Sequence, residues 1–111
     1  MTPIRLMELD IAIQEGDFEA VKQLITDDVN AITRRSAMYG TTALHMAAYY
    51  GHQEIIKELI AKGADVNART NEGDTSLHKA VAEGNKEAVE LLITAGADVN
   101  ARNDFEITPL H

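Results

Sequence analysis

The pattern of apolar and polar positions predicts short helices that come in pairs. The first helix of a pair lies within residues 42–51, where Leu44, Ala47 and Ala48 are three or four residues apart and share one side of a helix. Small alanines on that side allow a second helix to approach closely. The second helix covers about Gln53–Ala61, and its apolar residues form one wide face. These residues are Ile55, Ile56, Leu59 and Ile60.

The same segment carries signals for where each helix begins and ends. Thr42 suits a helix N-cap, because its hydroxyl accepts a hydrogen bond from an otherwise unpaired N–H. Gly51 ends the first helix, and Gly63 is well placed just after the second, where a left-handed conformation is common. Glu58 and Lys62 have the i, i+4 spacing of a favourable ion pair on the solvated side.

This pattern returns after 33 residues. Residues 39–71 match residues 72–104 at 16 of 33 positions, and in the later copy Val89, Leu92 and Ile93 are predicted to pack. A fixed period of this length is the signature of a stacked repeat, in which helix pairs bury their apolar faces against their neighbours. The hydrophobic pattern therefore fixes an architecture of stacked helix pairs.

A degenerate copy precedes the two full ones, and an incomplete copy follows them. With an offset of 35 residues, Leu9 takes the place of Leu44 and Asp10 that of His45. Terminal repeats are atypical because one of their faces meets water. In the last copy, Thr108 and Pro109 predict the start of another helix. We expect one domain over residues 1–111, with a degenerate repeat at 5–30, repeats at 40–71 and 73–102, and the start of another at 103–111.

The composition narrows the classes of partner and the compartment. The net charge is −8 and the pI about 4.8, which argues against non-specific binding to nucleic acid or to an anionic membrane. The chain has no cysteine, so disulfides, thiol catalysis and cysteine-based zinc sites are excluded. The N-terminus does not read as a signal peptide, and no stretch approaches the roughly 20 apolar residues of a membrane span. We expect a cytoplasmic protein.

The recurring motif resembles a known family. The pattern TxLHxAxxxG, followed by E, LI and GADVNA at a period of 33, looks like the ankyrin repeat and covers about residues 5–111. The resemblance implies an all-α ankyrin-repeat solenoid of stacked antiparallel helix pairs, with β-hairpin-like finger loops at right angles to the helices. Ankyrin proteins generally bind other proteins, through the finger tips and the exposed side of the inner helices. These together line what we call the concave face.

The resemblance also carries candidate partner-binding positions onto this chain. On the fingers these are Arg34, Arg35, Met38, Tyr39, Arg69, Asn71, Glu72 and Phe105. On the inner helices they are Met46, Tyr49, Tyr50, Lys79, Ala82 and Glu83, with Gln14 and Glu15 matching them in the first copy. Glu106 stands where the fingers otherwise have Gly40 and Gly73, so an altered turn is expected in the third finger.

The histidines invite a metal-site interpretation that geometry disfavours. His45, His78 and His111 recur every 33 residues, but neighbouring repeats sit about 10 Å apart, whereas zinc ligands lie about 2 Å from the metal. In the family, this histidine orients its ring to bond backbone groups of the finger. His52, at the start of a second helix, is expected to be cap-like. We expect no metal, no cofactor and no catalytic constellation, because no phosphate loop or activated nucleophile is present.

Tyr49 and Tyr50 are the strongest binding candidates. The next copy has Ala82 and Glu83 in their places, so the fold does not require aromatic residues there. Tyrosine is enriched at interface hot spots, because it offers a large rigid area with a polar tip. The alternative is that one tyrosine packs against the preceding long finger.

The connector Ala31–Gly40 is the second candidate and is unusually long. Its Arg34 and Arg35, with Met38 and Tyr39, suit a clamp for a carboxylate or phosphate. The alternative, which we favour, is a solvated loop whose arginines pair electrostatically with Asp27 and Asp28.

These observations favour a non-enzymatic scaffold that binds a protein or peptide on its concave face and finger tips. Two alternatives stay open. The apolar residues Ile107 and Leu110 at the C-terminal end lack cover, which suits self-association of an assembly module. The chain could also be an accessory fragment of a larger protein.

Overall fold

The computed structural model describes residues 2–36 and 39–110, and within them the fold is all-α. These residues form six α-helices and one short 3₁₀-helix, with no β-strand among them. The elements are α1 Thr2–Glu15, α2 Phe18–Asp27, η1 Val29–Ile32, α3 Ala43–Tyr50, α4 Gln53–Ala61, α5 Ser76–Ala82 and α6 Lys86–Thr94.

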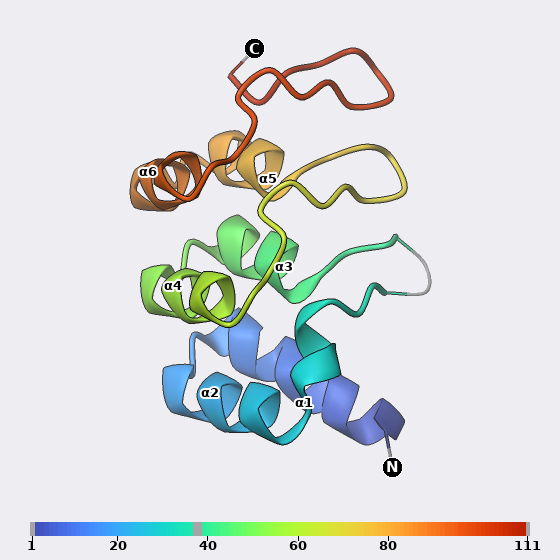
Figure 1. Cartoon of the computed structure of the whole chain (residues 1–111), viewed down its shortest axis with the longest axis vertical. Coiled ribbons are helices and arrows are strands. Elements are labelled where there is room, and N and C mark those ends of the chain that lie inside the picture. The colour runs from blue at the N-terminus through green and yellow to red at the C-terminus, as the bar shows by residue number, and fades with distance from the viewer. Residues whose placement is uncertain (1, 37–38, 111) are drawn as a thin grey trace.

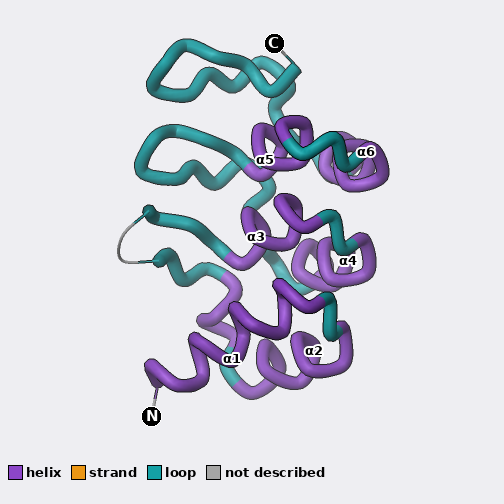
Figure 2. The backbone as a smooth tube through the Cα atoms, turned by 180° about the vertical axis from the view of Figure 1, so that it is seen from behind, coloured by secondary structure: helices purple, strands orange, loops and turns teal. Residues whose placement is uncertain are grey.

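The helices stack as three pairs. Figure 1 shows α2, α4 and α6 in one column and α1, α3 and α5 beside them, with the loops that precede α3 and α5, and the segment after α6, projecting to one side. The inner helices contact each other in the order α1, α3, α5, and the outer helices in the order α2, α4, α6. Figure 2 shows the three projecting loops, the fingers, from behind. The stack measures 39 × 27 × 21 Å.

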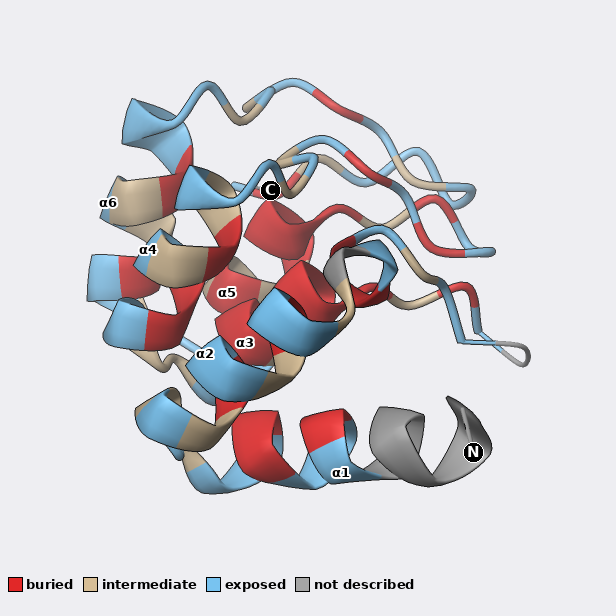
Figure 3. Cartoon of the chain, turned by 60° about the horizontal axis from the view of Figure 1, so that its bottom comes forward, coloured by how far each residue is buried: buried red, intermediate tan, exposed pale blue. Residues whose placement is uncertain are grey.

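The core runs through the stack along the sides where helices meet. Figure 3 shows buried segments on the helix sides that face their neighbours and exposed ones on the outward sides. The largest fully buried apolar residues come from every helix pair and are Ile13, Val21, Ile25, Leu44, Ile55, Ile56, Leu59, Leu77 and Leu92. The predicted apolar faces of α3 and α4 thus form the centre of the core.

Two expectations about packing at the C-terminal end are wrong. Ile93 is 41% exposed, whereas Ile60 at the same position of α4 is half-buried because α6 packs beside it. No helix forms at Thr108 and Pro109, where residues 109–110 make only a turn. A single helical turn fixes several backbone dihedrals for one hydrogen bond, so it is unfavourable without further helix or packing to support it.

Helix ends follow the predicted signals. Thr42 caps α3, and its side chain accepts a hydrogen bond from the backbone N–H of His45 at 3.3 Å. Gly51 and Gly63 adopt left-handed conformations with φ of 72° and 101°. The Glu58–Lys62 ion pair is formed at 3.9 Å. The bounds of α4 agree with the sequence prediction because its amphipathic pattern and the glycine after it point to the same ends.

The turn of the third finger keeps the geometry of the second, contrary to expectation. The backbone N–H of Glu106 donates to the Asn103 carbonyl at 3.0 Å, as Gly73 N–H donates to the Thr70 carbonyl at 2.9 Å. Glu106 reaches this geometry with a φ of 64°, and it is the one non-glycine residue with positive φ in the described chain. A left-handed conformation costs a non-glycine residue about 1–2 kcal/mol, so the third finger holds its turn under strain.

Candidate functional site

The three fingers are bound to one another near their tips. The backbone N–H of Asn71 donates to the carbonyl of Tyr39 at 2.9 Å, and Asp104 N–H donates to the carbonyl of Glu72 at 2.9 Å. Each bond joins one finger to the next at equivalent positions of the repeat. The fingers therefore form a connected surface beside the inner helices.

One side-chain oxygen organises each finger. Ser36 Oγ, Thr70 Oγ1 and Asn103 Oδ1 each accept two backbone N–H groups of their own finger, at 2.9–3.3 Å. Three different residue types accept these hydrogen bonds, so the repeat pattern alone did not reveal that one side-chain oxygen holds each finger. The only signal was a small polar residue at that point in every copy.

The histidines bind the finger that follows their helix. His45 Nδ1 accepts the backbone N–H of Thr42 at 3.0 Å, so the ring proton lies on Nε2, which donates to the carbonyl of Asp74 at 3.0 Å. His78 repeats this arrangement with Thr75 at 3.1 Å and with the carbonyl of Ile107 at 2.8 Å. This confirms the structural role expected for His45 and His78.

Burial lowers the pKa of His45 below its usual value, and the charges of Lys79 and Arg35 act in the same direction, while hydrogen bonds to the carbonyls of Asp74 and Ala68 oppose the shift. His45 is therefore held neutral. Within residues 2–36 and 39–110, no group of three or more histidine, aspartate or glutamate side chains is placed to hold a metal ion. His111 lies outside the described residues.

His52 is not a side-chain cap, contrary to expectation. It sits at the N-cap position of α4 but makes no capping hydrogen bond. Its Nε2 instead pairs with the carbonyl of Gln14 at 3.2 Å, which ties α4 to the preceding helix pair. Asn85 does the same one repeat later, donating from Nδ2 to the carbonyls of Ala48 and Tyr49 at 3.0 and 2.9 Å.

Arg34 makes the contact expected of it, and Arg35 does not. Arg34 pairs with Asp28 at 3.2 Å, which confirms the favoured alternative for this residue. Arg35 instead donates to the carbonyl of Gly40 at 3.2 Å and to the carbonyl of Arg69 in the next finger. Arg69 donates in turn to the carbonyl of Arg102 at 2.8 Å. The guanidinium groups of Arg35 and Arg69 thus act as bridges between fingers.

A cavity of about 220 Å³ lies where the first finger meets α1 and α3. Three of the predicted site residues, Arg34, Arg35 and Met46, line this cavity together. Asp10 also lines it, although the sequence singled out this residue only because it takes the place of a histidine. Burial raises the pKa of Asp10 above its usual value. The lining of this cavity therefore combines the charged side chains of Asp10, Arg34 and Arg35 with the apolar side chain of Met46.

Tyr49 and Tyr50 form an exposed aromatic pair at the end of α3. They are 45% and 39% exposed, and their rings meet edge to face with centroids 5.0 Å apart. The Tyr50 ring also stacks on His52 at 6.2 Å. The first finger enters α3 at its other end, so these contacts do not fit the alternative in which a tyrosine packs against that finger.

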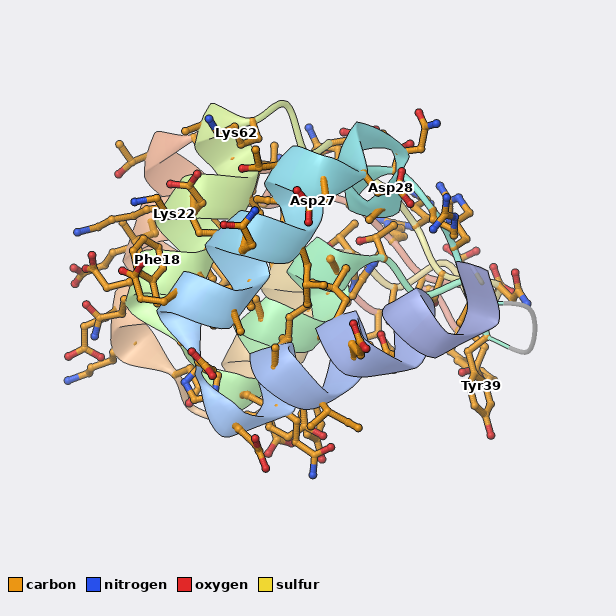
Figure 4. The ribbon with its side chains drawn as sticks, turned by 90° about the horizontal axis from the view of Figure 1, so that it is seen from below. Phe18, Lys22, Asp27, Asp28, Tyr39 and Lys62 are labelled. Atoms are coloured by element: carbon orange, nitrogen blue, oxygen red, sulfur yellow. The ribbon has the colours of Figure 1, made fainter. Side chains whose placement is uncertain are left out.

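The other predicted residues divide between the fingers and the inner helices. Lys79 is half-buried, with its Nζ 3.6 Å from Asp74. Tyr39 and Phe105 are exposed on the first and third fingers. Figure 4 shows Tyr39 extending from its finger on the side of the molecule opposite Phe18 and Lys22. Met38 lies outside the described residues.

A larger groove of about 480 Å³ lies on the other side of the molecule, between α4 and α6. Its walls include Lys57 and Ile60 of α4 and Glu90 and Leu91 of α6. The groove contains none of the predicted site residues. It is an alternative docking surface to the concave face.

Three stacked helix pairs, with fingers bound to one another and to the helices, define a helical-repeat solenoid. The chain matches the family model of ankyrin repeats (3 copies) over residues 9–103, and it belongs to this family. The family identification and the all-α solenoid expected from the sequence are confirmed.

Curated relatives share about half of this chain. Human ankyrin repeat domain-containing protein 49 is 42% identical over 60 residues, which are 53% of this chain and 24% of that protein. Zebrafish (Danio rerio) ankyrin repeat domain-containing protein 29 is 49% identical over 56 residues, 50% of this chain and 18% of that protein. Human oxysterol-binding protein-related protein 1 is 37% identical over 62 residues, 49% of this chain and 6% of that protein. The match thus spans less than a quarter of each of these relatives.

No helix among the described residues has the length and apolar character that crossing a membrane requires.

Proposed function

We propose that this chain is a non-enzymatic binding module that holds a segment of a partner protein against its concave face, with Tyr49 and Tyr50 at the centre. The observation that carries the proposal is the exposed aromatic pair on α3, at positions where the first and third helix pairs have Gln14 with Glu15 and Ala82 with Glu83. Ankyrin repeats generally mediate protein–protein interaction. The absence of cysteine fits a cytoplasmic setting for this role.

The rigidity of the scaffold supports this function. Hydrogen bonds between fingers, and from His45 and His78 to the fingers, hold the loops in place before any partner arrives. A surface that is already ordered loses less conformational entropy on binding. Tyr39 and Phe105 add exposed aromatic side chains on the fingers, where a partner could reach them.

The test is capture of partners by the wild-type chain and by the double variant Tyr49→Ala, Tyr50→Ala. We expect the variant to lose about 2 kcal/mol or more of binding free energy, which is roughly 30-fold in affinity, because tyrosine is enriched among the central interface residues whose truncation costs that much. The matched control is Lys57→Ala with Glu90→Ala on the outer helices, which should bind as the wild type does. Equal affinity of the tyrosine variant for every captured partner would contradict the proposal.

A second candidate function is self-association through the C-terminal end. Its support is the exposed apolar side chains of Ile93, Ile107 and Leu110 at one end of the stack. Contiguous exposed apolar surface marks interaction sites. Light scattering over a concentration series separates the two candidates, since a constant mass of 12.1 kDa at high concentration would rule out assembly. The same exposed end also suits a chain that is one part of a larger protein.

A further inference from the structure

We infer that the partner segment is basic, and that one of its lysine or arginine side chains lies on the Tyr49–Tyr50 pair between Glu15 and Glu83. This inference rests on the proposed function and adds the chemistry of the partner. It begins from a row of side chains along the inner helices.

Glu15, Tyr50 and Glu83 occupy the same position in three successive helix pairs. Each comes directly before the glycine that ends the inner helix, and these glycines share a left-handed φ of 69–73°. Because α1, α3 and α5 contact each other in that order, the row places one carboxylate on each side of the tyrosine pair. Neighbouring helices pack about 8–10 Å apart, within reach of one extended peptide.

Two hydrogen bonds between helix pairs hold this row together. His52, whose ring stacks on Tyr50, reaches the carbonyl of Gln14 at 3.2 Å, directly beside Glu15. Asn85, two residues after Glu83, donates to the carbonyl of Tyr49 at 2.9 Å. The ends of α1 and α5 are thereby fixed on either side of the aromatic pair.

The charges around the pair are not balanced within the described chain. Glu15 and Glu83 are exposed, and neither makes an ion pair with a described residue. Lys79, four residues before Glu83 on α5, is already 3.6 Å from Asp74, and Lys86, three residues after Glu83, begins the outer helix α6. The whole chain carries a net charge of −8, so the surrounding field also attracts cations.

These features distinguish between the classes of partner segment. An acidic segment would meet two carboxylates of like charge. An uncharged apolar segment would cover the tyrosine rings but desolvate the carboxylates without a compensating partner. A lysine or arginine side chain suits both the tyrosine rings and the two carboxylates, because its charge is attracted to an aromatic face as well as to carboxylates. Charge complementarity therefore favours a basic segment.

The test is selection from a displayed library of random 12-residue peptides by the immobilised chain, followed by titration of the selected peptides in solution. The chain contains no tryptophan, so a tryptophan added to each peptide gives an unambiguous fluorescence signal. We expect the selected peptides to be enriched in lysine and arginine. Their affinity should fall about fivefold to tenfold with Glu15→Gln, Glu83→Gln, since two exposed ion pairs are lost.

The control is Glu87→Gln with Glu90→Gln on the outer helix α6, which changes the net charge by the same amount. It should alter affinity less than about twofold, because both side chains line the groove between α4 and α6 and not the row of Glu15, Tyr50 and Glu83, and salt screens exposed charges that do not contact the ligand. Selected peptides without basic enrichment, or equal losses in the two glutamine variants, would overturn the inference.

The tyrosine variant keeps this inference separable from the proposed function. If Tyr49→Ala with Tyr50→Ala removes peptide binding while Glu15→Gln with Glu83→Gln leaves it unchanged, the concave site stands and the basic partner is wrong. If the tyrosine variant binds the selected peptides as the wild type does, the proposed function itself is wrong. Circular dichroism of each variant shows that the helices are intact.

Discussion

At the scale of single residues, His45 acts as a crosslink that depends on its neutral form. Nδ1 accepts a hydrogen bond from Thr42 while Nε2 donates to Asp74, so a second ring proton would meet the Thr42 N–H. The residue is fully buried, which makes a charged ring costly. The link between α3 and the second finger therefore exists in one protonation state.

This gives a prediction for stability as a function of pH. Burial lowers the pKa of His45 in the folded state, so the unfolded chain, with a histidine pKa of about 6.5, binds the proton first. The contribution of neutral His45 to the free energy of unfolding is complete above about pH 6.5, and it is lost progressively as the pH falls below that value. Urea unfolding between pH 7.5 and 5.5 measures the effect. The variant His45→Gln keeps a capping-box acceptor but does not titrate, so it should lose this part of the pH dependence. An NMR titration midpoint for His45 at or above 6.5 would contradict the prediction.

At the scale of elements, the junction between helix pairs explains why some glycines are required. A Cβ on Gly51 would lie 2.8 Å from Cγ of Asn85, the residue that binds the end of α3. Gly84 has nearly the same φ, 69° against 72°, but nothing lies within 4 Å of its Cβ position. Substituting each glycine in turn therefore distinguishes the cost of backbone strain, which both positions share, from the cost of disturbing the contact between repeats, which only Gly51 makes.

We predict that Gly51→Ala destabilises the chain more than Gly84→Ala does. Both variants pay about 1 kcal/mol or more for an alanine at positive φ, and only Gly51→Ala must also displace Asn85. The expected difference is about 1 kcal/mol or more, in line with overpacking at a close contact. Urea unfolding of the two variants gives it directly. Equal losses would show that the Asn85 contact contributes little to holding the pairs together.

The bounds of the helices could be predicted from the sequence, whereas the contacts between repeats could not. The bounds of α4 follow from the apolar face of Ile55, Ile56 and Leu59 with a glycine after it, which are local signals. The Arg35–Arg69 bridge and the His52 bond to Gln14 join residues 34 and 38 positions apart, and they depend on how closely the pairs stack. The strained turn at Glu106 was missed for a related reason: contacts with the second finger hold a turn that glycine would otherwise be needed to form.

At the scale of the whole molecule, the residues that hold the stack together differ from those that we propose to bind a partner. Histidines, finger-bridging arginines and the glycine junctions hold the helix pairs and fingers together. The exposed residues that the repeat does not demand gather on the inner helices and fingers, with Tyr49 and Tyr50 between Glu15 and Glu83. The acidic net charge makes this face attractive to a cationic partner at long range and sensitive to salt.

The most direct measurement is amide chemical-shift mapping of the ¹⁵N-labelled chain during titration with a partner peptide. The account predicts the largest changes at Glu15, Tyr49, Tyr50 and Glu83, with smaller ones on the fingers near Tyr39 and Phe105. Changes confined to the groove between α4 and α6, or to the C-terminal residues 95–110, would contradict it and move the binding surface elsewhere.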